Sequence, residues 1–280
     1  MRQKNGQNFL IDKNIANNIV KAANLKQQDL VLEVGPGRGI LTKIIQSQVK
    51  YLIAVEIDEF LYKQLNYYFS LHDDIKNIKI INMDFLKFNL DGLQFSKTLR
   101  GKILQQNSFK IVSNLPYSVG TAIIQRILPL SFWGVAVFML QKEVAQRLIA
   151  KTNSKNYGYI SIFSSYYAEC KVLFDVSANC FKPKPKVVSS VVKLMNKLPN
   201  SPELFFFDFV KHSFNMRRKT MLNCLSSFKN LGKRQATDIL NSCKLDMSLR
   251  PDRFSTSDFL FLTNKIKHYI ASTHVRIGFF

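Results

Sequence analysis

Acidic side chains are scarce in this sequence. Of its 280 residues, 19 are Asp or Glu and 40 are Lys or Arg, so the formal net charge is +21. Such a surplus opposes compaction unless a polyanion neutralises it, and nucleic acid is the polyanion that we expect. An anionic membrane is the competing partner, but no stretch approaches the ~20 continuous apolar residues of a membrane span. No basic amphipathic run dominates either, so we expect no membrane partner.

Cysteine and histidine are also few. The four cysteines form no C-x-x-C pair, and the four histidines are not spaced with cysteines or carboxylates as metal ligands would be. Neither a metal site nor a disulfide framework is therefore expected. No signal peptide is recognisable, which favours a reducing cytoplasm. Hydrophobic residues make up 46% of the chain, enough for a sizeable core. No symmetric apolar surface is evident, and we expect a monomer.

A glycine-rich turn follows the first buried-type strand. The strand covers residues 29–34, carries Glu33 near its end, and leads into Gly35, Gly37 and Gly39 before a helix that reaches about residue 48. Glycines permit a sharp turn and let a ligand lie against bare backbone, next to the helix N-terminus. A dinucleotide-binding loop requires G-x-G-x-x-G, and this spacing is G-x-G-x-G. An NAD-dependent dehydrogenase therefore fits poorly.

Two more strands end at acidic residues. Residues 51–55 form a predicted strand that ends at Glu56 and Ile57, about 21 residues beyond the first glycine, where a carboxylate meets a ribose diol in nucleotide-binding folds. Such a carboxylate accepts hydrogen bonds from both hydroxyls. Residues 78–81 form the next strand, which leads to Asp84 and Phe85. As an isolated residue, Asp84 would be read as a turn residue.

The stretch Asn114-Leu115-Pro116-Tyr117 contains candidate reactive-site groups. It follows an apolar strand at 109–113 and precedes a helix expected over 121–128. Pro116 lacks an N–H and biases Leu115 away from the α region, which leaves backbone carbonyls free to accept. Asn114 adds an acceptor and two donors, and Tyr117 offers a flat face for a base. Together they suit a planar ring with an exocyclic amine. An ordinary proline turn is the alternative interpretation.

A stiff, positively charged segment lies between predicted strands around 171–176 and 190–194. Phe181 precedes two prolines, Pro183 and Pro185, which favour an extended conformation. The alternating lysines are Lys182, Lys184 and Lys186. Phe181 is a candidate second wall for a base, beside lysines that reach phosphates. The alternative is a solvated loop with Phe181 in the core.

The alternation of strands and helices predicts an α/β fold with a twisted, mostly parallel sheet. A strand at 134–140, a helix at 141–148 and a loop at 153–159 continue this pattern, and residues 94–108 form a polar connection of helix plus loop. After a linker at 196–203, helices are predicted over 204–214, 221–228, 235–243 and 256–270. We expect domains at 1–196 and 204–280. Arg217, Arg218 and Lys219 form either a phosphate clamp or a solvated face.

Six motifs in order resemble the small-subunit ribosomal RNA adenine dimethyltransferases. They are Gly6–Leu10 before a helix at 15–23 capped by Asp12, the glycine turn, the pair of acidic strand ends counted as one motif, Asn114–Tyr117, F-x-P-x-P-x-V-x-S from Phe181, and F-N-x-R-R-K-T from Phe214. The resemblance runs from Gly6 to about Phe259. Ser118–Thr121 departs from the usual Asn-Ile-Ser/Ala-Thr, which affects only the fine shape of the pocket.

The resemblance implies a class I methyltransferase domain, Rossmann-like with seven strands, and a helical C-terminal RNA-binding domain. It implies S-adenosylmethionine as methyl donor and dimethylation of two adjacent adenosines near the 3′ end of 16S rRNA in late small-subunit precursors. The implied donor-binding residues are Asn8, Leu10, Gly35, Gly37, Glu56, Ile57, Asp84, Phe85 and Asn114. The implied catalytic residues are Asn114, Leu115, Pro116, Tyr117 and Phe181. The implied RNA contacts are Lys182, Lys184, Lys186, Arg217, Arg218 and Lys219.

Two other interpretations stay open. A resistance-type 23S rRNA adenine methyltransferase would use the same chemistry on another RNA, although the Pro-Lys segment and the Arg-Arg-Lys run look more like the small-subunit branch. A catalytically silent RNA- or DNA-binding factor would share the fold but not the reaction, and measurable donor binding would argue against it.

Overall fold

The computed structural model describes residues 7–89, 109–197 and 204–277, with side chains to residue 272. By its internal contacts the chain divides into two units, one of residues 1–146 and 167–198 and one of residues 147–166 and 199–280. Residues 147–166, which the sequence analysis puts in the first domain, thus contact the helical part of the chain. The predicted connection at 94–108 and residues 198–203 of the predicted linker lie outside the described residues.

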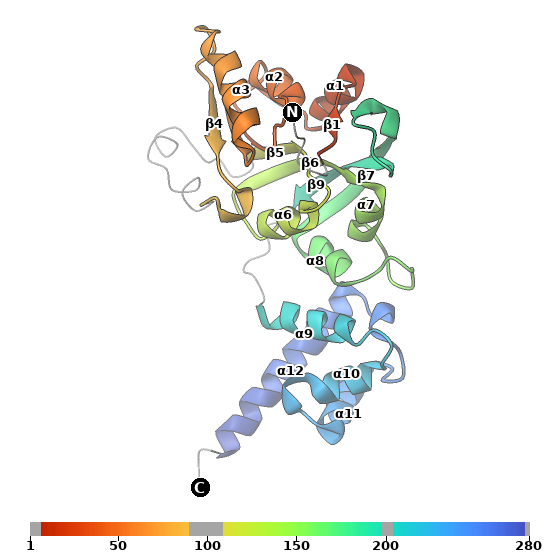
Figure 1. Ribbon diagram of the computed structural model, residues 1–280. Helices are drawn as coiled ribbons and strands as arrows, with labels where there is room; N and C mark the ends of the chain where they lie inside the picture. Colours follow the sequence, from red (N-terminus) through yellow and green to blue (C-terminus); the bar gives the residue numbers. More distant parts are fainter. Residues whose placement is uncertain (1–6, 90–108, 198–203, 278–280) are drawn as a thin grey trace. The chain divides into compact units, whose positions relative to one another are not determined.

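The first unit contains a seven-stranded sheet with the strand order β4-β3-β2-β5-β6-β9-β7 (Figure 1). The first five strands in that order are parallel, and β9 runs antiparallel to both β6 and β7. The strands are β2 (Leu30–Val34), β3 (Tyr51–Glu56), β4 (Ile78–Asn82), β5 (Phe109–Asn114), β6 (Trp133–Gln141), β7 (Ala168–Val176) and β9 (Ser189–Asn196). The predicted mostly parallel α/β sheet is confirmed. The chain order reverses between β2 and β5, so their carboxyl ends border the crevice where such sheets bind ligands.

Helices cover both faces of this sheet: α1, α2 and α3 on one side, α6 and α7 on the other (Figure 1). Their bounds are α1 (Lys13–Ala22), α2 (Ile40–Gln46), α3 (Glu59–Ser70), α6 (Gly120–Ile127) and α7 (Lys142–Leu148). The Asp12 carboxylate accepts hydrogen bonds from the Asn14 and Ile15 amides, which confirms the predicted N-cap. Such a bond satisfies a helix N–H that has no intrahelical partner. Helix α3 was not predicted from the sequence.

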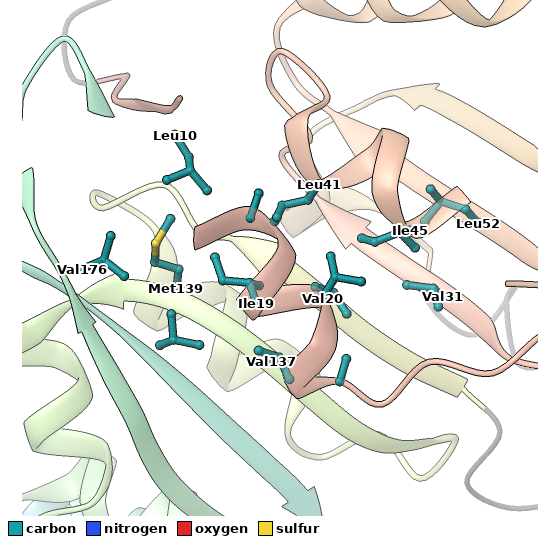
Figure 2. Close-up of a cluster of buried hydrophobic side chains, with 14 of the residues drawn as sticks. Leu10, Ile19, Val20, Val31, Leu41, Ile45, Leu52, Val137, Met139 and Val176 are labelled. Carbon is teal, nitrogen blue, oxygen red and sulfur yellow. The ribbon is translucent and has the colours of Figure 1, made fainter. Parts of the chain in front are cut away.

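A cluster of buried side chains joins α1 to the sheet (Figure 2). Ile19 and Val20 of α1 pack with Val31 of β2 and with Val137 and Met139 of β6, and each of these side chains is at most 1% exposed. Burying such a side chain contributes roughly 1.5–3 kcal/mol. The cluster therefore holds the segment before α1, residues 7–12, close to the carboxyl ends of the strands.

A short two-stranded sheet lies beside the main one. It pairs β1 (Phe9–Leu10) antiparallel with β8 (Phe181–Lys182), and a single 3-10 turn, η2 (Ala178–Cys180), precedes β8. Another 3-10 turn, η1 (Phe85–Lys87), follows β4. The N-terminal segment and the segment before the prolines are thereby joined through their backbones.

The second unit is helical. Its elements are α8 (Tyr159–Tyr167), α9 (Leu204–Asn215), α10 (Met221–Ser227), η3 (Phe228–Asn230), α11 (Lys233–Ser242), η4 (Pro251–Arg253) and α12 (Thr256–Ile277). Its core is aromatic: Phe206, Phe209 and Phe259 are fully buried. The Tyr157 hydroxyl donates to the Phe254 carbonyl at 3.0 Å, which ties residues 147–166 to this unit. The four predicted C-terminal helices are confirmed, whereas α8 was not predicted. Among the described residues, no helix has the length and apolar character needed to span a membrane.

Candidate methyl-donor and acceptor site

The turns after β2, β3 and β5 surround one cavity of about 310 Å³. Four segments line it: residues 7–10, residues between 33 and 41, residues between 56 and 61, and residues 114–119. The predicted site residues in its lining are Asn8, Leu10, Gly35, Gly37, Glu56, Ile57, Asn114, Leu115, Pro116 and Tyr117. Asp84, Phe85 and Phe181 are not in it. The predicted donor-turn and acceptor-loop residues therefore meet in one place.

The glycine turn is too tight for side chains at two of its positions. Gly37 has a φ of +58°, and a Cβ there would lie 3.2 Å from Cδ1 of Phe9. Gly39 has a φ of +78°, and a Cβ there would lie 2.4 Å from Cδ1 of Leu65. A positive φ strains any side-chain-bearing residue, and the second distance is a clash. The bare backbone at this turn forms one wall of the cavity, as a cradle for a nucleoside requires.

The Glu56 carboxylate is held by backbone amides at the end of β3. It is 3% exposed. One oxygen accepts from the Gly37 amide and the other from the Asp58 amide, both at 2.9 Å. Burial raises the pKa of this carboxyl, while the two amide bonds oppose the shift. Each carboxylate oxygen keeps a second lone pair, which suits it to accept from two vicinal hydroxyls.

Glu33 also lines the cavity and is fully buried in β2. Its Oε2 atom has no hydrogen-bond partner among the described residues. Burial raises the pKa of this carboxyl to about 8, so it holds a proton at neutral pH. In the sequence, Glu33 stands out only as the acid before the glycines. The signal that identifies it is an acidic residue inside an otherwise apolar strand.

The N-terminal segment is fastened to the edge of the cavity. Leu10 pairs with Phe181 across β1 and β8, and the Ile11 amide donates to the Cys180 carbonyl at 2.8 Å. The Arg38 guanidinium lies 4.6 Å from the centre of the Phe9 ring, which packs against the glycine turn. Asn8 and Leu10 are thus placed on the cavity by tertiary contacts.

The acceptor loop, residues 114–117, begins where β5 ends. The Leu115 amide donates to the Met139 carbonyl at 2.9 Å, which ties the loop to β6. The Pro116 carbonyl accepts from the Val119 and Gly120 amides at the start of α6, so it is not free as the sequence analysis expected. Within the described residues, no backbone amide donates to the Leu115 carbonyl. Beside the half-buried Asn114 side chain, this carbonyl is the available acceptor.

Three of the predicted donor-binding and catalytic residues lie outside the cavity lining and are bonded or buried elsewhere. Asp84 accepts from the Leu86 amide at 2.9 Å and caps η1, and Phe85 is 4% exposed. Arg126 of α6 donates to the Leu86 and Phe88 carbonyls and holds this turn in place. Phe181 is 3% exposed and belongs to the buried cluster that packs around α1. Their donor-binding and base-stacking roles stay predictions.

The predicted RNA contacts are all exposed. Lys182, Lys184 and Lys186 belong to the first unit, and Arg217, Arg218 and Lys219 to the second. The Arg217 guanidinium also donates to the Lys155 carbonyl at 2.9 Å, which orients it. Among the described residues, no group of three or more His, Cys, Asp or Glu side chains is arranged to hold a metal ion.

Known proteins resemble the chain over nearly its whole length. The family model described as ribosomal RNA adenine dimethylase matches residues 1–267. A relative from Malacoplasma penetrans, named ribosomal RNA small subunit methyltransferase A, is 37% identical over 262 residues, which are 92% of this chain and 89% of the relative. One of the same name from Francisella tularensis subsp. novicida is 36% identical over 269 residues, 92% and 95% of the two chains.

Two solved structures share the fold. A dimethyladenosine transferase from Plasmodium falciparum has a TM-score of 0.77 at 22% identity, covering 91% of this chain and 95% of the other. The 23S rRNA methyltransferase ErmE has a TM-score of 0.65 at 22% identity, covering 92% and 99%. Both confirm the class I methyltransferase fold with its helical second unit. Because the family match extends over 267 of the 280 residues, the chain belongs to the ribosomal RNA adenine dimethylase family, a family of S-adenosylmethionine-dependent methyltransferases.

Proposed function

We propose that this protein transfers two methyl groups from S-adenosylmethionine to the exocyclic amine of each of two adjacent adenosines near the 3′ end of 16S rRNA. The substrate is a late precursor of the small ribosomal subunit in the cytoplasm. The main support for this proposal is that the glycine turn, Glu56 and the acceptor loop at Asn114 line the same cavity. The relatives' name, ribosomal RNA small subunit methyltransferase A, supports the choice of the small subunit.

The cavity suits S-adenosylmethionine. The glycine turn presents bare backbone to the cavity, and Glu56 presents two oriented carboxylate oxygens to a ribose. Glu33 brings an oxygen that has no partner among the described residues, suited to a polar group of the methionine part. Asn8, Leu10 and Ile57 would cover the nucleoside, with Asp84 and Phe85 at the adenine. When bound, the donor supplies an electrophilic sulfonium methyl group.

The acceptor loop would activate the target amine by holding its hydrogens. An adenine amine is a poor nucleophile because its lone pair is delocalised into the ring. The Asn114 side-chain oxygen and the Leu115 carbonyl would each accept one N–H, which turns the lone pair out of conjugation and towards the donor. Hydrogen bonds from the amine to preorganised acceptors require little rearrangement during the reaction. The Pro116 carbonyl has a different task, since it accepts from the first amides of α6.

Stacking and charge would hold the RNA. The target base is extruded from its helix, as in other enzymes that act on base atoms, and Tyr117 offers it a ring face at the cavity. The lysines at 182, 184 and 186 and the basic run at 217–219 would contact phosphates. No general base is required, because the nitrogen becomes strongly acidic once it is methylated and releases its proton readily.

Methyl transfer from labelled S-adenosylmethionine tests the proposal. Three substrates are compared: small subunits that lack dimethyladenosine, mature small subunits, and naked 23S rRNA. The expected result is label confined to two adjacent adenosines of the small subunits that lack dimethyladenosine. Label on 23S rRNA would assign the protein to the resistance-type branch. Donor and RNA binding without any transfer would overturn the enzymatic proposal in favour of a silent RNA-binding factor.

A further inference from the structure

A hydrogen bond joins the acceptor loop to the strand that follows the lysine segment, residues 182–186. The Tyr117 hydroxyl lies 2.6 Å from the Ser189 Oγ atom, although the two residues are 72 positions apart in the chain. Ser189 is the first residue of β9 and is fully buried, although it directly follows the exposed residues Val187 and Val188. The bond therefore links the aromatic ring at the cavity to the end of the segment that carries the lysines.

We propose that Ser189 is a positioning residue, which fixes the ring of Tyr117 at the angle needed to stack on the target adenine. This inference rests on the proposed function, because it takes base stacking as the task of the ring. A tyrosine ring turns about two side-chain torsions, and a bond to its far end restrains both. The bond thus presents one ring orientation to the base before RNA arrives, which lowers the entropic cost of stacking.

The surroundings of the bond favour this role. Tyr117 is half-buried and lines the cavity, so one part of its ring is packed while another part faces the ligand space. Burial raises the pKa of the Tyr117 hydroxyl, and either of the two hydroxyls can donate the hydrogen bond. Because Ser189 is buried, water competes weakly for the same hydroxyl.

A neighbouring serine provides a matched control. Ser190 is 1% exposed, and its hydroxyl donates to the Asp175 carboxylate at 2.6 Å. Successive residues of a strand point to opposite faces, so Ser190 shares the burial and the strand of Ser189 but not its contact with Tyr117. A general disturbance of β9 would appear in both serine-to-alanine variants, whereas a loss of ring position would appear only at Ser189.

The first test is a double-mutant cycle on methyl transfer. Ser189→Ala and Tyr117→Phe remove the same hydrogen bond from its two ends, and each is expected to lower kcat about tenfold, the upper range for one such bond. The double variant is expected to be no slower than either single variant. Ser189→Thr keeps the hydroxyl and should restore most of the rate, and Ser190→Ala should stay within about twofold of wild type. The KM for donor should not change.

The second test reads ring position directly. RNA carrying 2-aminopurine at the target position loses fluorescence when that base stacks on an aromatic ring. At saturating protein, the quenching is expected to be weaker in Ser189→Ala than in wild type or Ser190→Ala. If Ser189→Ala fails to fold, Tyr117→Phe removes the same hydrogen bond at the half-buried Tyr117. Its 2-aminopurine quenching is then compared with that of wild type and Ser190→Ala.

Several results would overturn the inference. Additive losses in the double variant, equal losses in Ser189→Ala and Ser190→Ala, or unchanged 2-aminopurine quenching would each show that the bond does not position the ring. A wild-type protein that transfers no methyl group at all would instead refute the proposed function. In that case the fluorescence comparison still decides whether Ser189 sets the angle of the ring towards a bound base.

Discussion

The buried carboxyl of Glu33 should make the stability of the first unit depend on pH. Its pKa is about 8 in the folded protein, against an ordinary value of 4.5. The folded state therefore holds a proton that the unfolded chain has released at neutral pH. Stability from this group is complete below pH 4.5 and is lost as the pH rises through 8. Replacement by Gln, which mimics the neutral carboxyl, should remove this dependence.

The size of the effect follows from the two pKa values. The gap from 4.5 to about 8 corresponds to about 5 kcal/mol in total, at about 1.4 kcal/mol for each pH unit. Roughly 3 kcal/mol of this stability is lost between pH 6 and pH 9. The rest is lost between pH 4.5 and pH 6, below the range measured. Wild type should therefore lose roughly 3 kcal/mol more than Glu33→Gln over this range. Because Glu33 is fully buried, solvent screening reduces this difference little.

Urea unfolding at pH 6, 7.5 and 9 measures the difference. Trp133 is the single tryptophan and is fully buried in β6, so its fluorescence reports the unfolding of the first unit. Glu59→Gln is the matched control, since Glu59 lies in the same unit with its side chain 67% exposed. Its pH profile should run parallel to that of wild type. Parallel profiles of wild type and Glu33→Gln would refute the reasoning, because they would mean that Glu33 ionises without penalty.

Three further predictions concern the cavity. Asn114→Ala should abolish methyl transfer and leave RNA affinity nearly unchanged in a filter-binding assay; a large loss of RNA binding would contradict the acceptor role. Gly39→Ala should destabilise the first unit by about 1–3 kcal/mol in urea unfolding, because of its positive φ and the clash with Leu65; an unchanged midpoint would show that the turn relaxes freely. Arg126→Ala should weaken donor binding about tenfold by calorimetry, because its guanidinium holds the turn that carries Asp84, the proposed contact to the donor adenine. Equal loss of RNA affinity in that variant would indicate general unfolding instead.

Local patterns in the sequence determined most of the fold. Apolar runs of strand length, the glycine turn and the Asp12 cap each act within a few residues, and the structure places β2, β5 and α1 where these signals predict them. The strand-turn-helix order also put Gly35 and Asn114 at the carboxyl ends of parallel strands. Because parallel strands end at the same edge of a sheet, their meeting at one cavity could be expected from sequence.

Tertiary contacts decided the properties that depend on distant parts of the chain. The proton on Glu33 depends on burial between strands and helices, and the bond between Tyr117 and Ser189 spans 72 positions. Phe181 could be read as an exposed stacking ring or as a core residue, and only packing placed it in the core cluster. No periodicity within a few residues encodes such contacts. The sequence by itself therefore determined which groups surround the cavity, while the folded structure decided which of them are protonated, buried or held in place.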